Sequence, residues 1–245
     1  MIRLILPAFV MLFFTSHLVA ATPLDSLAYQ TYATRAFHKW PAIIAAQETQ
    51  AKQGIAKHVD VITPYINYYG YVGHLLDTKQ KEEASRWLKK AIRSFEPVRK
   101  QYPDQAAIWA LHTMFVSYEI ALSPYKAPYR LPELLSSLHK AEALDKDHYL
   151  VHLARANFML YFPETLGGDK EEALKHYKAI YTYFQDPAYE AQANWVYLNI
   201  LSTISFTYEK LARYPEAIEW AKRALVVTPD FAFVKNDLLP RLESR

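Results

Sequence analysis

Two adjacent glycines are the first residues in the sequence that could carry chemistry. Gly167 and Gly168 stand in the stretch PETLGGDKEEALKHY, and the whole chain has only five glycines. A phosphate-binding loop would need the pattern GxxxxGK[ST] after a buried strand. No strand pattern precedes this pair, and the acidic side chains that follow would repel phosphate. We therefore predict a turn between two helices, with Asp169 as N-cap and Glu172 as its return partner in a capping box.

Two histidines have the spacing of metal ligands. His148 and His152 are four residues apart, so both could face one ion from a single helix, and Asp145 and Asp147 lie nearby. A structural zinc site has four protein ligands and a catalytic site three, usually His, Cys or carboxylate. No third ligand is evident from the pattern. We expect no metal and no cofactor, with a zinc site as the alternative.

The residues needed for the common catalytic motifs are missing. The sequence contains no GxSxG, no HExxH and no cysteine. The absence of cysteine excludes disulfides, a thiolate metal site, a cysteine nucleophile and a lipid-bearing N-terminal cysteine. The acidic pairs at 82–83 and 171–172 fall where first turns of helices are expected, and the helix dipole favours acids there. We therefore expect no catalytic residues and no enzymatic activity.

The composition describes a folded chain with little net charge. Its 245 residues are 51% hydrophobic and 15% aromatic, and the formal net charge is +3. Disordered chains combine low hydrophobicity with high net charge, which is the opposite pattern. The lysines and arginines do not cluster into a basic tract, so we expect no nucleic-acid partner.

The N-terminus has the three parts of a secretory signal peptide. Arg3 gives a short positive region, residues 4–14 form an apolar core, and Val19-Ala20-Ala21 provides small residues before a cleavage point. The apolar run is short for a membrane span of roughly 20 residues. We predict a signal peptide at 1–21 and an exported chain, periplasmic or secreted, with no stable membrane span after cleavage. A retained anchor is the alternative.

The remaining sequence has the pattern of successive helices. No segment shows the period of two that is typical of strands, and prolines fall mainly between helical stretches. Five segments share one arrangement of small and bulky residues, and their anchor positions are spaced by 41, 50, 39 and 44 residues. The anchors are Ile43, Ala84, Leu134, Ala173 and Ala217. A helical hairpin that recurs at this period indicates an α-solenoid.

The segment 198–231 resembles a tetratricopeptide repeat (TPR). It carries Ala217, Ala224 and Pro229 at the family's spacing, after Leu201, Ile204, Ser205 and Tyr208 on its first helix. The Gly-Gly-Asp turn is similar to turns in the TPR-like T components associated with TRAP transporters. The resemblance implies an all-α, right-handed α-solenoid of about five TPR-like hairpins in one domain, 22–245. The expected repeats are 25–57, 65–98, 105–146, 147–184 and 194–231, with a C-terminal capping helix at 232–243.

The same resemblance implies a binding surface on the concave face, formed by the first helix of each pair. Matched by position, this face would comprise Ile66, Tyr69, Gly73, Leu76, Ala110, Met114, Ser117, His148, Val151, Arg155, Asn199, Ser202, Phe206 and Glu209. Two inserted loops, 123–131 and 162–168, should be neighbours on one edge of the solenoid. Tyr125, Lys126, Tyr129 and Arg130 would form a basic and aromatic rim there.

Two functions remain open from the sequence. The first is a noncatalytic scaffold that binds a protein or peptide partner along the concave groove. The alternative is a ligand-binding accessory of a transport system that holds a small apolar or acidic molecule between repeats. A closed pocket lined by tyrosine and phenylalanine would favour the alternative, and an open groove with exposed apolar residues would favour the scaffold.

Overall fold

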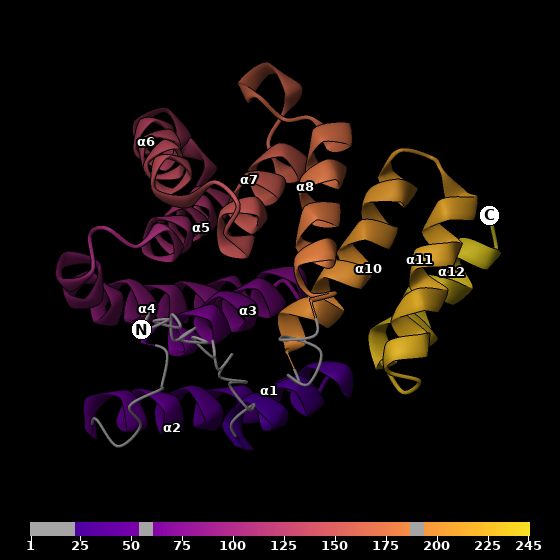
Figure 1. Ribbon diagram of the computed structural model, residues 1–245, viewed down its shortest axis with the longest axis horizontal. Helices are drawn as coiled ribbons and strands as arrows, with labels where there is room; N and C mark the ends of the chain where they lie inside the picture. The colour runs from indigo at the N-terminus through magenta and orange to yellow at the C-terminus, as the bar shows by residue number, and fades with distance from the viewer. Residues whose placement is uncertain (1–22, 54–60, 187–193) are drawn as a thin grey trace, which may run out of the picture.

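The computed structural model describes residues 23–53, 61–186 and 194–245, and within them the chain is helical with no strand (Figure 1). The all-α prediction is thereby confirmed for the described residues. The predicted signal peptide, 1–21, and the end of the first expected repeat, 54–57, lie outside them. In the described ranges no helix combines the length and apolar character that crossing a membrane requires.

The helices follow one another with short connections. In chain order they are α1 (Pro23–Ala33), α2 (Trp40–Gln53), α3 (Thr63–Asp77), α4 (Lys81–Gln101), α5 (Ala106–Leu122), α6 (Ala127–Asp145), α7 (Tyr149–Tyr161), α8 (Lys170–Tyr183), α10 (Trp195–Lys210), α11 (Tyr214–Val227) and α12 (Leu239–Glu243). A π-helical turn, Val234–Leu238, leads into α12. Short 3₁₀ turns precede α2, α6 and α8, at Phe37–Lys39, Pro124–Lys126 and Glu164–Leu166.

Neighbouring helices pack in pairs, and the pairs form a curved row (Figure 1). The closest partners are α3 with α4, α5 with α6, α7 with α8, and α10 with α11. Further contacts of α3 with α5, α5 with α7 and α8 with α10 connect successive pairs. Alanines at the crossings, including Ala84, Ala173 and Ala217, are completely buried, so the helix backbones can approach closely there.

Three hairpins turn on a residue other than glycine with positive φ. Arg35, Lys79 and Ala212 have φ of 58°, 61° and 56°. After α10, the Arg213 N–H donates to Tyr208 O at 2.9 Å and the Ala212 N–H to Glu209 O at 3.0 Å. This is the Schellman pattern, and the turns after α1 and α3 repeat it. The sequence gives no glycine signal for any of these three turns.

Glycine at position 212 is expected to stabilise the protein. A residue with a Cβ is strained at positive φ, so Ala212→Gly should raise the free energy of unfolding by about 1 kcal/mol in urea denaturation. Ala45 is exposed inside α2 and provides the matched control. Ala45→Gly should lower stability by about 1 kcal/mol because glycine weakens a helix interior. A destabilising Ala212→Gly would contradict the observed turn.

The Gly-Gly-Asp turn joins α7 to α8 as predicted, with one difference. Gly167 has φ of 96°, and Asp169 caps α8 by accepting from the N–H groups of Glu171 at 2.9 Å and Glu172 at 3.1 Å. The predicted return bond from the Glu172 side chain is wrong. The Asp169 N–H donates instead to Met159 O at 2.8 Å, and the Glu172 carboxylate pairs with Lys175.

The inserted loop predicted at 123–131 is shorter than expected. Helix α6 begins at Ala127, because a 3₁₀ turn and Pro128 near its start already direct the chain into a helix. Tyr65 of α3 belongs to the core. It is buried, and its hydroxyl donates to Ser94 O of α4 at 2.8 Å.

Candidate ligand-binding cavity

The inner side of the row of helices forms a partly open cavity of about 760 Å³. Its wall comes from α1, α3, α5, α7 and α10, from the turns around 124–127 and 161–166, and from residues 231–233. These segments are far apart in the sequence, so the cavity is a product of the whole row. The volume lies within the range of about 300–1,000 Å³ that is typical of ligand pockets.

Helix α3 contributes side chains that are three to four residues apart and therefore share one face. Tyr69, Gly73, Leu76 and Asp77 all line the cavity. The Tyr69 ring stacks on the Tyr118 ring of α5 with centroids 5.2 Å apart. Gly73 permits this approach, because a Cβ at this position would lie 2.6 Å from the Tyr118 hydroxyl oxygen.

Hydrogen bonds fix the aromatic wall in place. The Tyr177 hydroxyl donates to Asn157 Oδ1 at 2.7 Å, and Asn157 Nδ2 donates to the Tyr69 hydroxyl at 2.8 Å. Asn199 Nδ2 donates to the Tyr32 hydroxyl at 2.9 Å. Burial raises the pKa of Tyr69 and raises that of Tyr32 to about 12, so both phenols are neutral near pH 7.

The first helix meets the C-terminal part of the chain beside the cavity. The Tyr29 hydroxyl lies 2.5 Å from Thr228 Oγ1, and Arg35 forms an ion pair with Asp237. The rings of Tyr32 and Phe231 are 5.6 Å apart. Helix α1 also packs on α10, as Figure 1 shows. The two ends of the described row are thus joined.

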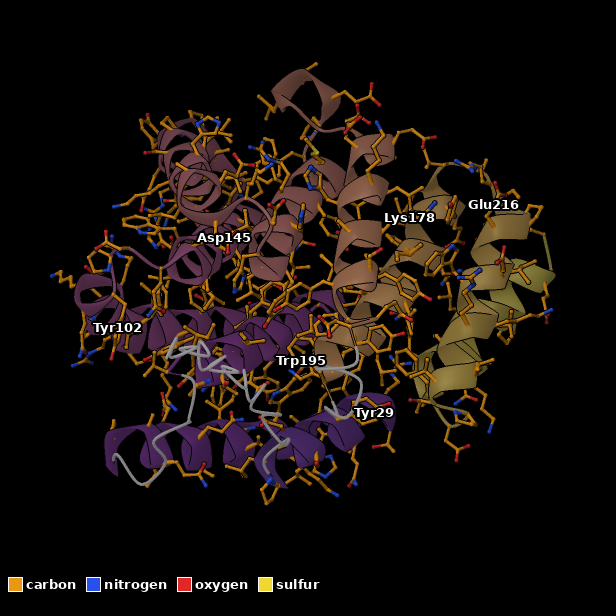
Figure 2. All side chains as sticks on the ribbon, in the orientation of Figure 1. Tyr29, Tyr102, Asp145, Lys178, Trp195 and Glu216 are labelled. Carbon is orange, nitrogen blue, oxygen red and sulfur yellow. The ribbon has the colours of Figure 1, made fainter. Side chains whose placement is uncertain are left out.

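Trp195 lies at the centre of the region where α10 meets α1 and α3 (Figure 2). Its indole N–H donates to Asn67 Oδ1 of α3 at 2.6 Å, and its ring meets Trp40 edge-on at 5.2 Å. Gly70 leaves room for the ring, since a Cβ there would lie 2.5 Å from it. One face of this core tryptophan also borders the cavity. The cavity wall and the core between α3 and α10 therefore depend on the same residue.

Several residues predicted from the concave face lie in the cavity wall. Tyr69, Leu76, Met114, Asn199 and Phe206 line it, together with Gly73, Ser117 and Ser202. The structure brings these residues, from three helices, around one hollow. Their role in binding stays a prediction.

Other predicted residues lie elsewhere. His148 is the N-cap of α7, with its Nδ1 accepting from the Leu150 N–H at 3.1 Å, and Arg155 pairs with Glu142 across 2.6–2.7 Å. Neither lines the cavity. Ile66, Ala110 and Val151 are buried in the core, and Glu209 binds Arg241.

The predicted rim lies outside the cavity. Tyr125 and Tyr129 are 76% and 83% exposed, and Arg130 is bound by Glu119 and Glu133. Pro124 and Ala127 of one inserted segment and Pro163 and Leu166 of the other line the same cavity, and direct contact between the two segments stays a prediction. The side chains of Tyr125 and Tyr129 lie on a surface that is separate from the cavity.

The sequence did not identify a second group of cavity residues. These are Tyr32, Tyr118, Asn157, Tyr161 and Trp195. Asn157 and Tyr161 lie in α7 at positions that the TPR resemblance did not assign to the concave face. Tyr32 enters the cavity because α1 packs against α10, which is a contact between distant segments that local periodicity does not encode.

Two of the histidines near α7 form a hydrogen-bonded pair. His152 Nδ1 lies 2.8 Å from His176 Nδ1, so one ring donates and the other accepts. No group of three or more potential ligands occurs in the part of the chain that the structure describes.

Acid is expected to weaken the fold through this pair. Burial lowers the pKa values of both His152 and His176 below 6.5, so the unfolded state binds protons more readily. The stability they contribute is present above about pH 6.5 and is lost as the pH falls through their lowered pKa values. We expect less free energy of unfolding at pH 5 than at pH 7.5, and a smaller difference in His176→Asn. An unchanged difference in this variant would contradict the assignment.

Comparison with known proteins identifies no family for this chain. No protein-family model matches the sequence, and no curated protein matches it. Among solved structures, the chain is similar to a thermophilic TPR protein of Thermus thermophilus. The alignment covers 90% of this chain and 96% of that one, with 18% identity and a TM-score of 0.48. The similarity is one of helical fold, and nothing about a ligand follows from it.

Proposed function

We propose that the chain is a noncatalytic binding protein that holds a small, mostly apolar molecule in the cavity. The observation that carries this proposal is a hollow of about 760 Å³ walled by tyrosine, phenylalanine and tryptophan with a few polar groups. Ligand pockets typically combine an apolar, aromatic lining with a small number of placed polar groups. Asn157, Asn199 and Ser202 are the polar groups at hand.

We further propose that the helix pairs are TPR-like repeats of one right-handed superhelix. The pairs would be α1/α2, α3/α4, α5/α6, α7/α8 and α10/α11, with residues 232–243 covering the last one. The contacts within and between pairs support this arrangement. Val234, Leu238 and Leu242 are buried next to α11, as expected of a cap.

The way the cavity is walled favours a small molecule over an extended peptide. A peptide groove needs open ends, whereas here α1 meets residues 228–237 through the Tyr29–Thr228 and Arg35–Asp237 contacts. Tyr161 lines the cavity and is 66% exposed, so its aromatic ring is accessible to a molecule that enters there.

A fluorescent apolar probe tests the proposed function. We expect N-phenyl-1-naphthylamine to bind with one-to-one stoichiometry and enhanced emission. Phe206→Ala should weaken binding by about tenfold, because it removes an apolar contact worth about 1–2 kcal/mol. Tyr129→Ala, on the exposed surface, is the matched control and should leave Kd unchanged. Equal Kd values for both variants, or no binding by the parent protein, would refute the proposal.

A second candidate function rests on the exposed tyrosines. Tyr125 and Tyr129 present large aromatic surfaces to solvent near the start of α6. Exposed tyrosines of this kind are enriched at protein–protein interfaces. We propose them as a contact surface for a protein partner. Crosslinking in the native fraction should yield a defined partner that is lost in Tyr125→Ser/Tyr129→Ser and retained in Phe206→Ala.

We also propose that the chain is exported after removal of residues 1–21. The charged, apolar and small-residue segments of the N-terminus support this proposal. N-terminal sequencing of the protein from the exported fraction should begin at Thr22. Recovery of the intact N-terminus in the cytoplasmic fraction would contradict it.

A further inference from the structure

The aromatic wall of the cavity has an electrostatic preference. The faces of aromatic rings are electron-rich and attract cations through the ring quadrupole. Tyr32, Tyr69, Tyr118 and Tyr161 line the cavity, as does Phe206. Burial raises the pKa values of Tyr32, Tyr69 and Tyr118, so these rings carry no charge near pH 7. Tyr69 and Tyr118 stack on each other, and wherever a ring face of this wall remains accessible it attracts an organic cation more than an anion.

One carboxylate of this wall has no partner among the described residues. Of the described lining residues, Asp77 alone carries a carboxylate. Its side chain is exposed and forms no hydrogen bond or ion pair with another described residue. The cations among the lining residues do not pair with it, since Arg35 pairs with Asp237 and burial lowers the pKa of His74. Asp77 is therefore the charged residue of the described lining that no ion pair neutralises.

The charge on Asp77 reaches the tyrosine rings. After burial, which is the main cause, Asp77 contributes to the raised pKa of Tyr32. It also acts on His74, where it opposes the effect of burial and of Arg35. Asp77, Tyr32 and Tyr161 all line the cavity.

The position of Asp77 in α3 is locally unfavourable. Asp77 is the last residue of this helix, where the helix dipole is negative and opposes a carboxylate. A neutral residue would suit the helix better. Substitution of Asp77 can therefore test binding without a loss of stability.

We propose that the cavity takes a small organic cation with an apolar body, such as a quaternary ammonium compound. The charged group would lie between Asp77 and the rings of Tyr32 and Tyr161. The apolar body would contact Met114 and Phe206 on the facing wall. This inference rests on the proposed function and specifies the charge of the ligand.

Three probes with one alkyl chain and different head groups test the proposal by calorimetry. They are octyltrimethylammonium, 1-octanol and octanoate, each used below its micelle concentration. We expect the cation to bind about tenfold more tightly than the alcohol, and the anion more weakly than both. Asp77→Asn should weaken binding of the cation about tenfold and leave the alcohol unchanged. Asp104→Asn, an exposed acid between α4 and α5, is the matched control.

The outcomes separate this inference from the proposed function. Equal Kd values for the alcohol and the cation, or tightest binding of octanoate, would overturn the cation proposal and leave the apolar site standing. An unchanged cation Kd in Asp77→Asn would also overturn it. Failure of N-phenyl-1-naphthylamine to bind refutes the proposed function itself. Thermal melting checks that the Asp77→Asn variant is folded. We expect its melting temperature to be equal to or higher than that of the parent protein.

Discussion

Replacing Trp195 with alanine is expected to lower the free energy of unfolding by about 4 kcal/mol. Trp195 is almost completely buried, and it packs against Trp40, Tyr32 and the space left by Gly70. Truncation removes this packing and leaves Asn67 Oδ1 without its donor. Because the ring lies where α10 meets α1 and α3, loss of it loosens contacts between both ends of the chain. Urea denaturation measures the change directly.

Two companion variants show which part of the interaction matters. Trp195→Phe keeps much of the ring but removes the N–H, so we expect a loss of about 1–3 kcal/mol from the unpaired Asn67 acceptor. Trp109 lies at the edge of the protein and donates to Pro103 O at 2.7 Å. Trp109→Ala should cost clearly less than Trp195→Ala. Similar losses for the two alanine variants would mean that Trp195 is not the central contact.

Filling the cavity is expected to abolish binding while the protein stays folded. Ala121 of α5 is exposed and lines the cavity, so a tryptophan there can enter the hollow without displacing the core. Ala121→Trp should weaken binding of N-phenyl-1-naphthylamine about 100-fold, equivalent to about 2.7 kcal/mol. Its stability should change by less than about 1 kcal/mol, since no buried contact is lost. Fluorescence titration and urea denaturation measure the two effects.

Variants at two other positions make the cavity-filling experiment decisive. Thr203→Trp introduces the same bulk from α10 and should have the same effect. Val226 on α11 is 82% exposed and does not line the cavity. Val226→Trp should therefore bind the probe normally. Normal binding by both Ala121→Trp and Thr203→Trp would show that the probe binds elsewhere.

Much of the helical fold could be predicted because the residue patterns that indicate helices are local in the sequence. Tyr68, Tyr71 and Leu75 share one face of α3 and are buried as their spacing predicts. The alanines at the helix crossings could also be predicted, because their recurring positions are visible in the local sequence. The turns on Lys79 and Ala212 could not be predicted, since nothing in these residue types favours positive φ.

The cavity was predicted only in part, because its enclosure depends on distant contacts. Tyr69, Met114, Asn199 and Phe206 follow from the inner faces of first helices. Closure by α1 depends on contacts of its residues with the C-terminal part of the chain, roughly 200 residues away. Register alone also does not show that His148, at a helix start, caps that helix, and its predicted role in partner binding stays a prediction.

The structure of the protein with bound N-phenyl-1-naphthylamine tests the central claim most directly. The cavity account predicts one probe molecule between α3, α5 and α10, in contact with Tyr69, Met114 and Phe206. A probe on the outer surface beside Tyr125 and Tyr129, or a cavity filled by the protein's own side chains, would contradict it.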